Sequence, residues 1–191
     1  MRKLVYDVAT TLDNFISHHD GSVDGFVFEG DHVVEYLERL EGYDTVIMGR
    51  NTYEWGYRMG IAPGAAPYPH MRNYVFSRTL RLENSAVTIV DRDELAVIER
   101  LKSEEGTAIY LCGGGAFAGM LLDHGLIDQL VIKQNPIVYG SGVRLFGNST
   151  REVGLRLVSS KAYDTGVVLL RYDLLYAGAG RKPPAEGIER G

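Results

Sequence analysis

Three consecutive glycines, Gly113, Gly114 and Gly115, lie between an apolar run at 107–112 and a helix-like stretch at 116–125. A strand that ends in glycines and continues directly into a helix is a common phosphate-binding arrangement. The first N–H groups of a helix have no partner within it and carry partial positive charge, and glycine lets an anion approach the backbone closely. The segment therefore predicts a phosphorylated ligand, with a tight turn that binds nothing as the alternative.

The same glycines also fit the pattern G-x-G-x-x-A, through Gly113, Gly115 and Ala118. This pattern is the dinucleotide fingerprint of Rossmann domains, whose glycine turn holds a pyrophosphate. Rossmann fingerprints usually open their domain, whereas this one comes late in the chain. The match therefore supports a phosphate-binding turn but is weak support for a Rossmann domain.

Two further polar clusters follow apolar segments that we expect to be strands. In the first, at 49–52 (GRNT), Arg50 can clamp a phosphate and Thr52 can bind one or cap a helix. The second is Ser77 with Arg78, which suits a phosphate monoester such as the 2′-phosphate that distinguishes NADP from NAD. A solvated arginine with a helix cap, and an ordinary surface turn, are the respective alternatives.

Asp13 stands just past the carboxyl end of the first expected strand. An aspartate in this position can anchor a polar heterocycle by hydrogen bonds or assist a proton transfer. The alternative is a loop aspartate that only forms a turn.

Other motifs exclude several classes of enzyme. His18 and His19, with Asp20 and Asp24, match no zinc spacing, so we expect no metal site. The chain contains no G-x-S-x-G, no H-E-x-x-H and no P-loop, which leaves hydrolase and kinase functions without support.

The elements that position these residues alternate along the chain, and this alternation predicts an α/β sheet with parallel pairings. A closing hairpin adds an antiparallel edge. In such sheets ligands bind beyond the carboxyl ends of the strands, so the turns at 49 and 113 can face one ligand from two sides. We expect strands at 3–9, 45–48, 73–77, 86–90, 107–112 and 127–134, a hairpin of 152–162 with 167–176, and helices at 32–41, after Asp91, and at 116–124.

Two details of the helices follow from local patterns. The first helix should bury Val33, Tyr36, Leu37 and Leu40 on one face, with Asp31 as its N-cap. Asp91 with Glu94 resembles a capping box that opens the second helix.

Composition describes an ordinary globular protein. The 191 residues are 45% hydrophobic and 24% charged, with a net charge of −5 and no block of Lys and Arg, which argues against a nucleic-acid partner. We expect one domain at 1–176 and a flexible tail at 177–191. No apolar run is long enough to span a bilayer and the N-terminus is a poor signal peptide, so we expect a cytoplasmic protein. The single cysteine, Cys112, should be buried and inert.

Taken in order, six segments resemble the dihydrofolate reductase-like superfamily, in the branch that contains the reductase domain of bacterial riboflavin biosynthesis. Together they extend over nearly the whole domain, and the ordered set is far more specific than any one motif. The segments are VATTLDNFIS (8–17), HDGSVDG (19–25), VIMGRNTYE (46–54), YVFSRT (74–79), IYLCGGGAFAGMLL (109–122) and IDQLVIKQNPIVYGSGVRLFG (127–147).

The resemblance implies a three-layer fold, with a mixed, mostly parallel sheet and an antiparallel C-terminal hairpin, and it implies NADPH as cofactor. It places Asp13 in the substrate cleft as the catalytic residue and implies a cis peptide between Gly113 and Gly114. The riboflavin branch usually has glycine where this chain has Asn14, which tolerates the same left-handed backbone. The implied cofactor-binding residues are Ala9, Gly49, Arg50, Asn51, Thr52, Ser77, Arg78, Gly113, Gly114, Gly115, Ala116 and Phe117.

The resemblance thus predicts an NADPH-dependent oxidoreductase of a small heterocycle, of the 5-amino-6-(5-phosphoribosylamino)uracil reductase type. Dihydrofolate reduction is an alternative, although Glu35 and Glu38 on the first helix fall in no recognisable folate motif. A dinucleotide-binding module without catalysis is another. The riboflavin branch is commonly dimeric, which predicts a homodimer with a small-molecule substrate and without a nucleic-acid or membrane partner.

Overall fold

The computed structural model describes residues 1–176, and the tail expected at 177–191 lies outside this range. Its strands are β1 (Leu4–Thr10), β2 (Phe15–Ser17), β3 (Thr45–Gly49), β4 (Arg72–Phe76), β5 (Thr88–Val90), β6 (Ile109–Gly113), β7 (Gln129–Gln134), β8 (Val143–Arg144), β9 (Gly154–Ala162) and β10 (Val168–Leu175). Its helices are α1 (Asp31–Glu41), α2 (Arg50–Trp55), the 3₁₀ turn η1 (Gly56–Met59), α3 (Glu94–Ser103) and α4 (Gly115–Asp123).

One sheet of eight strands organises the domain, in the order β5-β4-β3-β6-β1-β7-β10-β9. The pairs from β5 to β7 are parallel, and β10 pairs antiparallel with both β7 and β9. The predicted mixed, mostly parallel sheet with an antiparallel C-terminal hairpin is therefore confirmed. The strand β1 lies in the middle, so its carboxyl end is flanked by those of β6 and β7.

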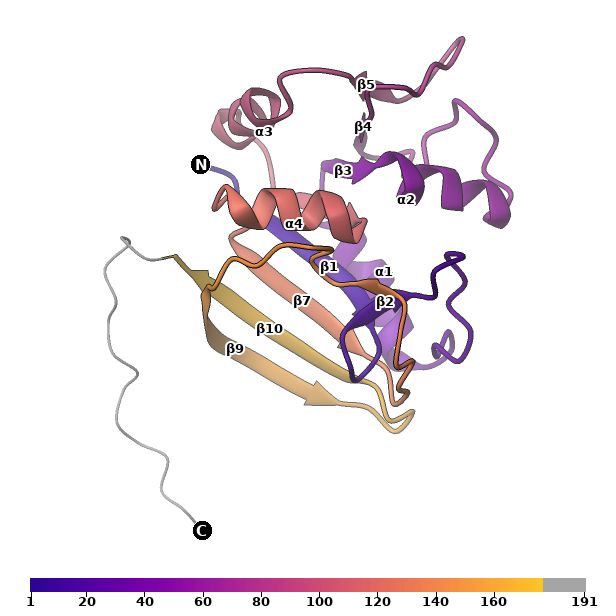
Figure 1. The fold of residues 1–191 in the computed structure, drawn as a ribbon, viewed down its shortest axis with the longest axis vertical. Coiled ribbons are helices and arrows are strands. Elements are labelled where there is room, and N and C mark those ends of the chain that lie inside the picture. The colour runs from indigo at the N-terminus through magenta and orange to yellow at the C-terminus, as the bar shows by residue number, and fades with distance from the viewer. Residues whose placement is uncertain (177–191) are drawn as a thin grey trace.

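Two hydrophobic clusters lie on opposite faces of the sheet, which gives three layers (Figure 1). Alternate residues of β1 divide between them, because successive side chains of a strand point to opposite faces. Tyr6 packs with α3 and α4, whereas Val5 packs with Leu40 of α1 and Tyr53 of α2. The helices thus cover both faces and leave the strand ends to carry polar groups.

The buried side of α1 differs from the predicted one. Leu37 is 57% exposed, whereas His32 and Leu40 are buried, so the expectation for Leu37 is wrong. The sheet covers only one side of α1, and the arginine of its last turn occupies part of that side by pairing with a carboxylate on β1. Asp31 is the first residue of the helix and Gly30 precedes it as the cap.

The start of α3 and one small ribbon also depart from the expectation. The helix begins at Glu94 after Asp93, whose backbone is left-handed and whose side chain makes no capping bond, so the capping box at Asp91 is wrong. The short strands β2 and β8 pair antiparallel in a separate ribbon that the sequence did not predict. Among residues 1–176, no helix is both long and apolar enough to cross a membrane.

Candidate functional site

The turns after β3 and β6 meet at the carboxyl edge of the sheet. Met48 pairs with Gly113 in the ladder, which places Gly49 beside the glycine run. A Cβ atom added at Gly49 would lie 3.8 Å from the Gly114 nitrogen, and one at Gly114 would lie 3.1 Å from Thr52 Oγ1. The two glycine turns therefore lie side by side, and that they face one ligand stays a prediction. The peptide between Gly113 and Gly114 is cis, as the resemblance implies.

The N-terminus of α4 opens onto the same space. Gly114 is its N-cap and offers no side-chain bond to the first N–H groups, which are therefore free to bind an anion. Ala116 is exposed on the first turn, and the ring of Phe117 packs 4.7 Å from that of Phe76, centroid to centroid. A Cβ atom at Gly115 would overlap the carbonyl oxygen of Arg144, so only glycine fits where the β8 segment crosses the helix.

The predicted phosphate-binding arginines follow adjacent strands and reach solvent. Arg50, at the start of α2, donates to Glu54 Oε1 at 2.8 Å and to Thr79 Oγ1 at 2.8 Å. Arg78, past β4, pairs with Glu94 at 3.3 Å, and its side chain is 81% exposed.

The hydroxyl and amide that accompany these arginines differ in their surroundings. Ser77 Oγ accepts the backbone N–H groups of Thr79 and Leu80, which closes the turn after β4. Asn51 is exposed on α2. The structure thus brings the 49–52 and 77–78 clusters to neighbouring positions on one edge, and their roles toward a ligand remain predictions.

Asp13 ties two loops together. Its carboxylate accepts hydrogen bonds from the Thr11 hydroxyl at 2.6 Å and from the backbone N–H groups of Gly140 at 2.7 Å and Tyr139 at 3.2 Å. These bonds hold the pKa of Asp13 below its ordinary value, and the bond from Thr11 contributes most to this shift. The carboxyl group is therefore ionised at neutral pH and cannot donate a proton at that pH. Asn14 adopts the left-handed backbone that its position was expected to require, with φ of 63°.

A buried charged group beneath α1 was missed by the sequence reasoning. Asp7, on β1, is fully buried and accepts from Arg39 Nε at 3.0 Å, and its other oxygen lies 3.3 Å from Lys133 Nζ. The ammonium of Lys133 also lies 3.3 Å from the centre of the Tyr36 ring. The only sequence signal was a carboxylate in an otherwise apolar strand, since the two cations come from distant segments.

This charged group lies on the face of the sheet that carries Ala9. Ala9 pairs directly with Lys133 in the β1–β7 ladder, and Asp7 is two residues earlier on the same strand, so all three side chains share one face. Burial lowers the pKa of Lys133, and the Asp7 carboxylate opposes that shift. The sheet floor next to the predicted cofactor residue thus carries a cation able to donate a proton.

Tyrosine side chains pack around the group. The hydroxyls of Tyr36 and Tyr110 are 2.9 Å apart, and Tyr68 Oη lies 3.4 Å from the Cys112 sulfur. Cys112 is half-buried rather than buried as predicted, and desolvation raises the pKa of its thiol, which keeps it protonated at neutral pH. Among residues 1–176, no group of three or more His, Cys, Asp or Glu side chains is placed to hold a metal ion.

Comparison with known proteins gives consistent matches over the whole domain. The RibD C-terminal domain family matches residues 2–169. The uncharacterized protein YwjB of Bacillus subtilis (strain 168) is 34% identical over 170 residues, which is 88% of this chain and 96% of YwjB.

Two solved structures share the fold. A protein of Shewanella sp. PV-4 that is named for riboflavin biosynthesis superposes with a TM-score of 0.77 at 24% identity, over 92% of this chain and all of its own. The diaminohydroxyphosphoribosylaminopyrimidine deaminase/5-amino-6-(5-phosphoribosylamino)uracil reductase of Thermotoga maritima gives 0.70 at 17% identity, over 91% of this chain and 56% of its own.

Proposed function

Since the chain belongs to the RibD C-terminal domain family, we propose that it is an NADPH-dependent reductase of a small heterocycle. The observation that carries the proposal is the meeting of two glycine turns with the N-terminus of α4 at one sheet edge. Phosphate groups are bound by this combination of close backbone approach and unpartnered N–H groups. We propose a substrate of the 5-amino-6-(5-phosphoribosylamino)uracil type because the fold is similar to that of the Thermotoga maritima enzyme.

The residues present fit a dinucleotide. Gly49 and Gly114 leave open a space that side chains would narrow, beside the hydroxyl of Thr52. In the proposal the glycine turns and the first N–H groups of α4 hold the pyrophosphate, with Gly113, Gly115, Ala116 and Phe117 at the helix start and Asn51 and Arg50 on the adenosine side. Ser77 and Arg78 bind the 2′-phosphate, and Ala9 contacts the nicotinamide.

NADPH supplies the hydride when bound, and the chain supplies orientation, exclusion of water and the proton. Ala9 and Lys133 lie side by side in the ladder, and 10% of the Lys133 side chain is accessible, so a substrate ring held against Ala9 would lie next to it. Asp7 holds that ammonium by charge and by its 3.3 Å contact. Lys133 is therefore the proposed proton donor, and Asp13 holds the loops after β1 and β7 together.

Dihydrofolate reduction is a weaker proposal because of the surroundings of the two carboxylates on α1, Glu35 and Glu38. The Glu35 carboxylate accepts hydrogen bonds from Lys161 Nζ at 2.5 Å and Tyr163 Oη at 2.7 Å, both on the C-terminal hairpin. Glu38 is exposed. The bonds from Lys161 and Tyr163 hold the pKa of Glu35 below its ordinary value, so at neutral pH this carboxylate has no proton to give to a pterin.

Fluorescence titration of the protein with NADPH and NADH tests the proposed cofactor. We expect NADPH to bind, followed by oxidation of NADPH when aminopyrimidine substrates are added. Binding without turnover on panels of pyrimidines and pterins would instead support a binding module. If the protein binds neither nucleotide, both the reductase proposal and the binding-module proposal are refuted.

We also propose that the chain forms a homodimer through β9. Every residue of this edge strand is exposed, including Leu155, Leu157 and Val158. An exposed apolar edge strand presents unpaired backbone groups that favour pairing with another strand. Light scattering should give twice the mass of the chain, and Leu157→Lys should shift the protein toward a monomer. A monomeric wild-type protein would contradict this assembly.

A further inference from the structure

A second concave site lies on the α1 face, at the opposite end of the strands from the glycine turns. It is a cavity of about 190 Å³ next to Val5 at the start of β1 and Ala108 just before β6. Val5 is five residues from the carboxyl end of β1, which corresponds to about 16 Å of extended strand. The cavity is therefore separate from the proposed NADPH site.

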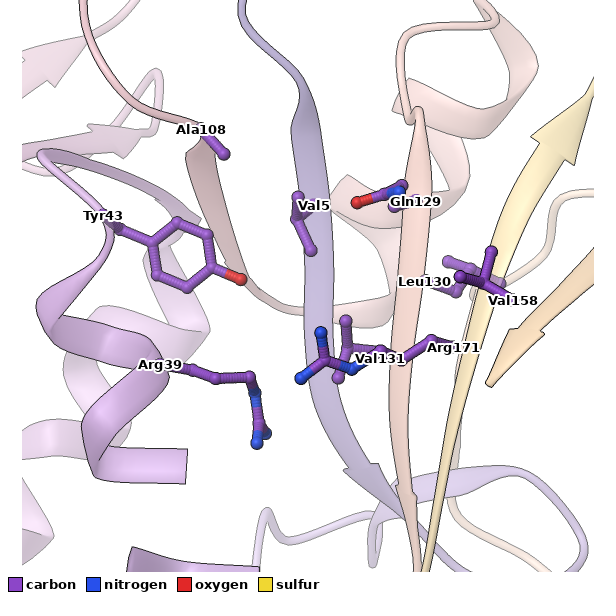
Figure 2. A pocket seen from close by; sticks show the side chains of 9 residues that line it. All are labelled: Val5, Arg39, Tyr43, Ala108, Gln129, Leu130, Val131, Val158 and Arg171. Carbon is purple, nitrogen blue, oxygen red and sulfur yellow. The ribbon is translucent and has the colours of Figure 1, made fainter. Parts of the chain in front are cut away.

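Two guanidinium groups enter this cavity from different elements. Figure 2 shows Arg39 reaching in from α1, and Arg171 extending from β10 across β7 toward β1. Arg39 is neutralised by Asp7. Among the described residues, no carboxylate lies within 4.0 Å of the Arg171 guanidinium.

Three carboxylates on this side of the sheet are already paired with other cations. Asp7, in the same ladder row as Arg171, is shared by Arg39 and Lys133. Asp173, two residues along β10, accepts from Arg156 at 2.6 Å. Glu35, on α1, accepts from Lys161 at 2.5 Å. Arg171 thus supplies an uncompensated positive charge to a half-enclosed site, where an anion gains more from pairing than it would in bulk water.

The rest of the lining is a phenol, the Gln129 amide and aliphatic side chains. Burial raises the pKa of Tyr43 to about 12, so its hydroxyl stays protonated at neutral pH and can donate to an anion. The ladder between β9 and β10 shifts register beside Arg171, and Val158, left without a partner there, lies against the cavity with Val131. A ligand in this cavity can accept hydrogen bonds from Arg171 and Tyr43 and can pack its apolar part on the aliphatic side chains.

We propose that this pocket binds a small organic carboxylate. The carboxylate lies between Arg171 and the Tyr43 hydroxyl, and the hydrocarbon part packs on Val131 and Val158. The planar guanidinium matches both oxygens of a carboxylate, which makes this pairing stronger than a bond between neutral groups. The aliphatic lining favours such a ligand over a fully hydrated inorganic anion.

Calorimetric titration with benzoate tests the proposal, with benzyl alcohol as a neutral ligand of similar shape. We expect benzoate to bind the wild-type protein and benzyl alcohol to bind at least about tenfold more weakly. Arg171→Gln should lower benzoate affinity by about tenfold or more, whereas Arg92→Gln, at an exposed arginine outside the cavity lining, should leave it unchanged. NADPH affinity should be the same in all three proteins.

A second variant guards against misfolding of the first. Tyr43→Phe removes the donor hydroxyl and keeps the ring that stacks on Tyr110, so it should lower benzoate affinity by about tenfold while circular dichroism stays unchanged. The proposal is overturned if benzoate binds Arg171→Gln as well as it binds the wild type, or if benzyl alcohol binds equally well. The proposal is also overturned if benzoate fails to bind at high millimolar concentration, even where the reason is that a second copy of the chain covers the cavity. It is overturned as well if inorganic phosphate binds more tightly than benzoate.

Discussion

Asp7 on β1 and Lys133 on β7 lie 3.3 Å apart beneath α1, and both residues are buried. The backbone ladder places Lys133 opposite Ala9, so the pair forms the charged end of the sheet floor at the proposed nicotinamide position. Arg39 supplies a second cation to the same carboxylate. One buried carboxylate is therefore shared by two cations from separate elements, and its loss should affect both stability and chemistry.

Replacement of Asp7 by asparagine should destabilise the fold strongly. The change leaves the charges of Arg39 and Lys133 buried without a counter-charge, and breaking buried pairs in this way typically costs about 3–5 kcal/mol. Urea unfolding of Asp7→Asn measures the loss. Asp91→Asn, which removes an exposed pair with Arg92, should change the free energy of unfolding by less than about 1 kcal/mol. Equal losses in the two variants would contradict the account.

Lys133 should control the pH dependence of turnover. Only its protonated form can donate a proton, and burial lowers its pKa, so kcat should fall as pH rises through a value below that of an ordinary lysine. Lys133→Met keeps the length of the side chain and removes the proton. This variant should lose about 10²–10⁴-fold in kcat, keep its NADPH affinity and show no fall in that pH range. An unchanged profile would exclude Lys133 as the donor.

Two glycine substitutions should separate binding from folding. A Cβ atom at Gly49 has its nearest neighbour, Phe117 Cβ, at 3.4 Å, so Gly49→Ala should fold normally while narrowing the proposed pyrophosphate space and weakening NADPH. A Cβ atom at Gly115 would overlap the Arg144 carbonyl, so Gly115→Ala should lower the melting temperature. Thermal melts and NADPH titrations on both variants distinguish the effects. Unaltered NADPH binding by Gly49→Ala would place the pyrophosphate elsewhere.

Arg78 should decide the preference between the two nicotinamide cofactors. Among residues 1–176, its exposed guanidinium pairs with Glu94 alone, at 3.3 Å, and can reorient toward a 2′-phosphate. Arg78→Ala should weaken NADPH by about 1.5–3 kcal/mol, which is the typical value of a charge-assisted contact, and should leave NADH nearly unchanged. Arg92→Ala serves as the control. Equal losses for both cofactors would contradict a contact with the 2′-phosphate.

The order of motifs in the sequence predicted the sheet and the edge where the glycines meet. The positions of glycines that follow strands can be predicted from the sequence. Their backbone freedom is a local property, and the strand pattern fixes which end of the sheet they occupy. Gly49 and Gly113 therefore lie where the sequence placed them. The left-handed Asn14 is another local property that was visible in advance.

The charged group beneath α1 could not be predicted in the same way. Lys133 becomes buried only because the β1–β7 register turns it toward Asp7, and Arg39 reaches them only once α1 has packed on the sheet. The exposure of Leu37 has the same origin, since a helical periodicity shows which residues share a face but not how much of that face the sheet covers.

The central position of β1 has a consequence for synthesis of the chain. Leu4 pairs with Ile109, and Thr10 pairs with Gln134, so both neighbours of the first strand emerge from the ribosome on the order of a hundred residues later. At typical elongation rates β1 waits roughly 5–20 s without a partner. The nascent chain must therefore shield an apolar strand during translation, and the domain closes only when its C-terminal half has been made.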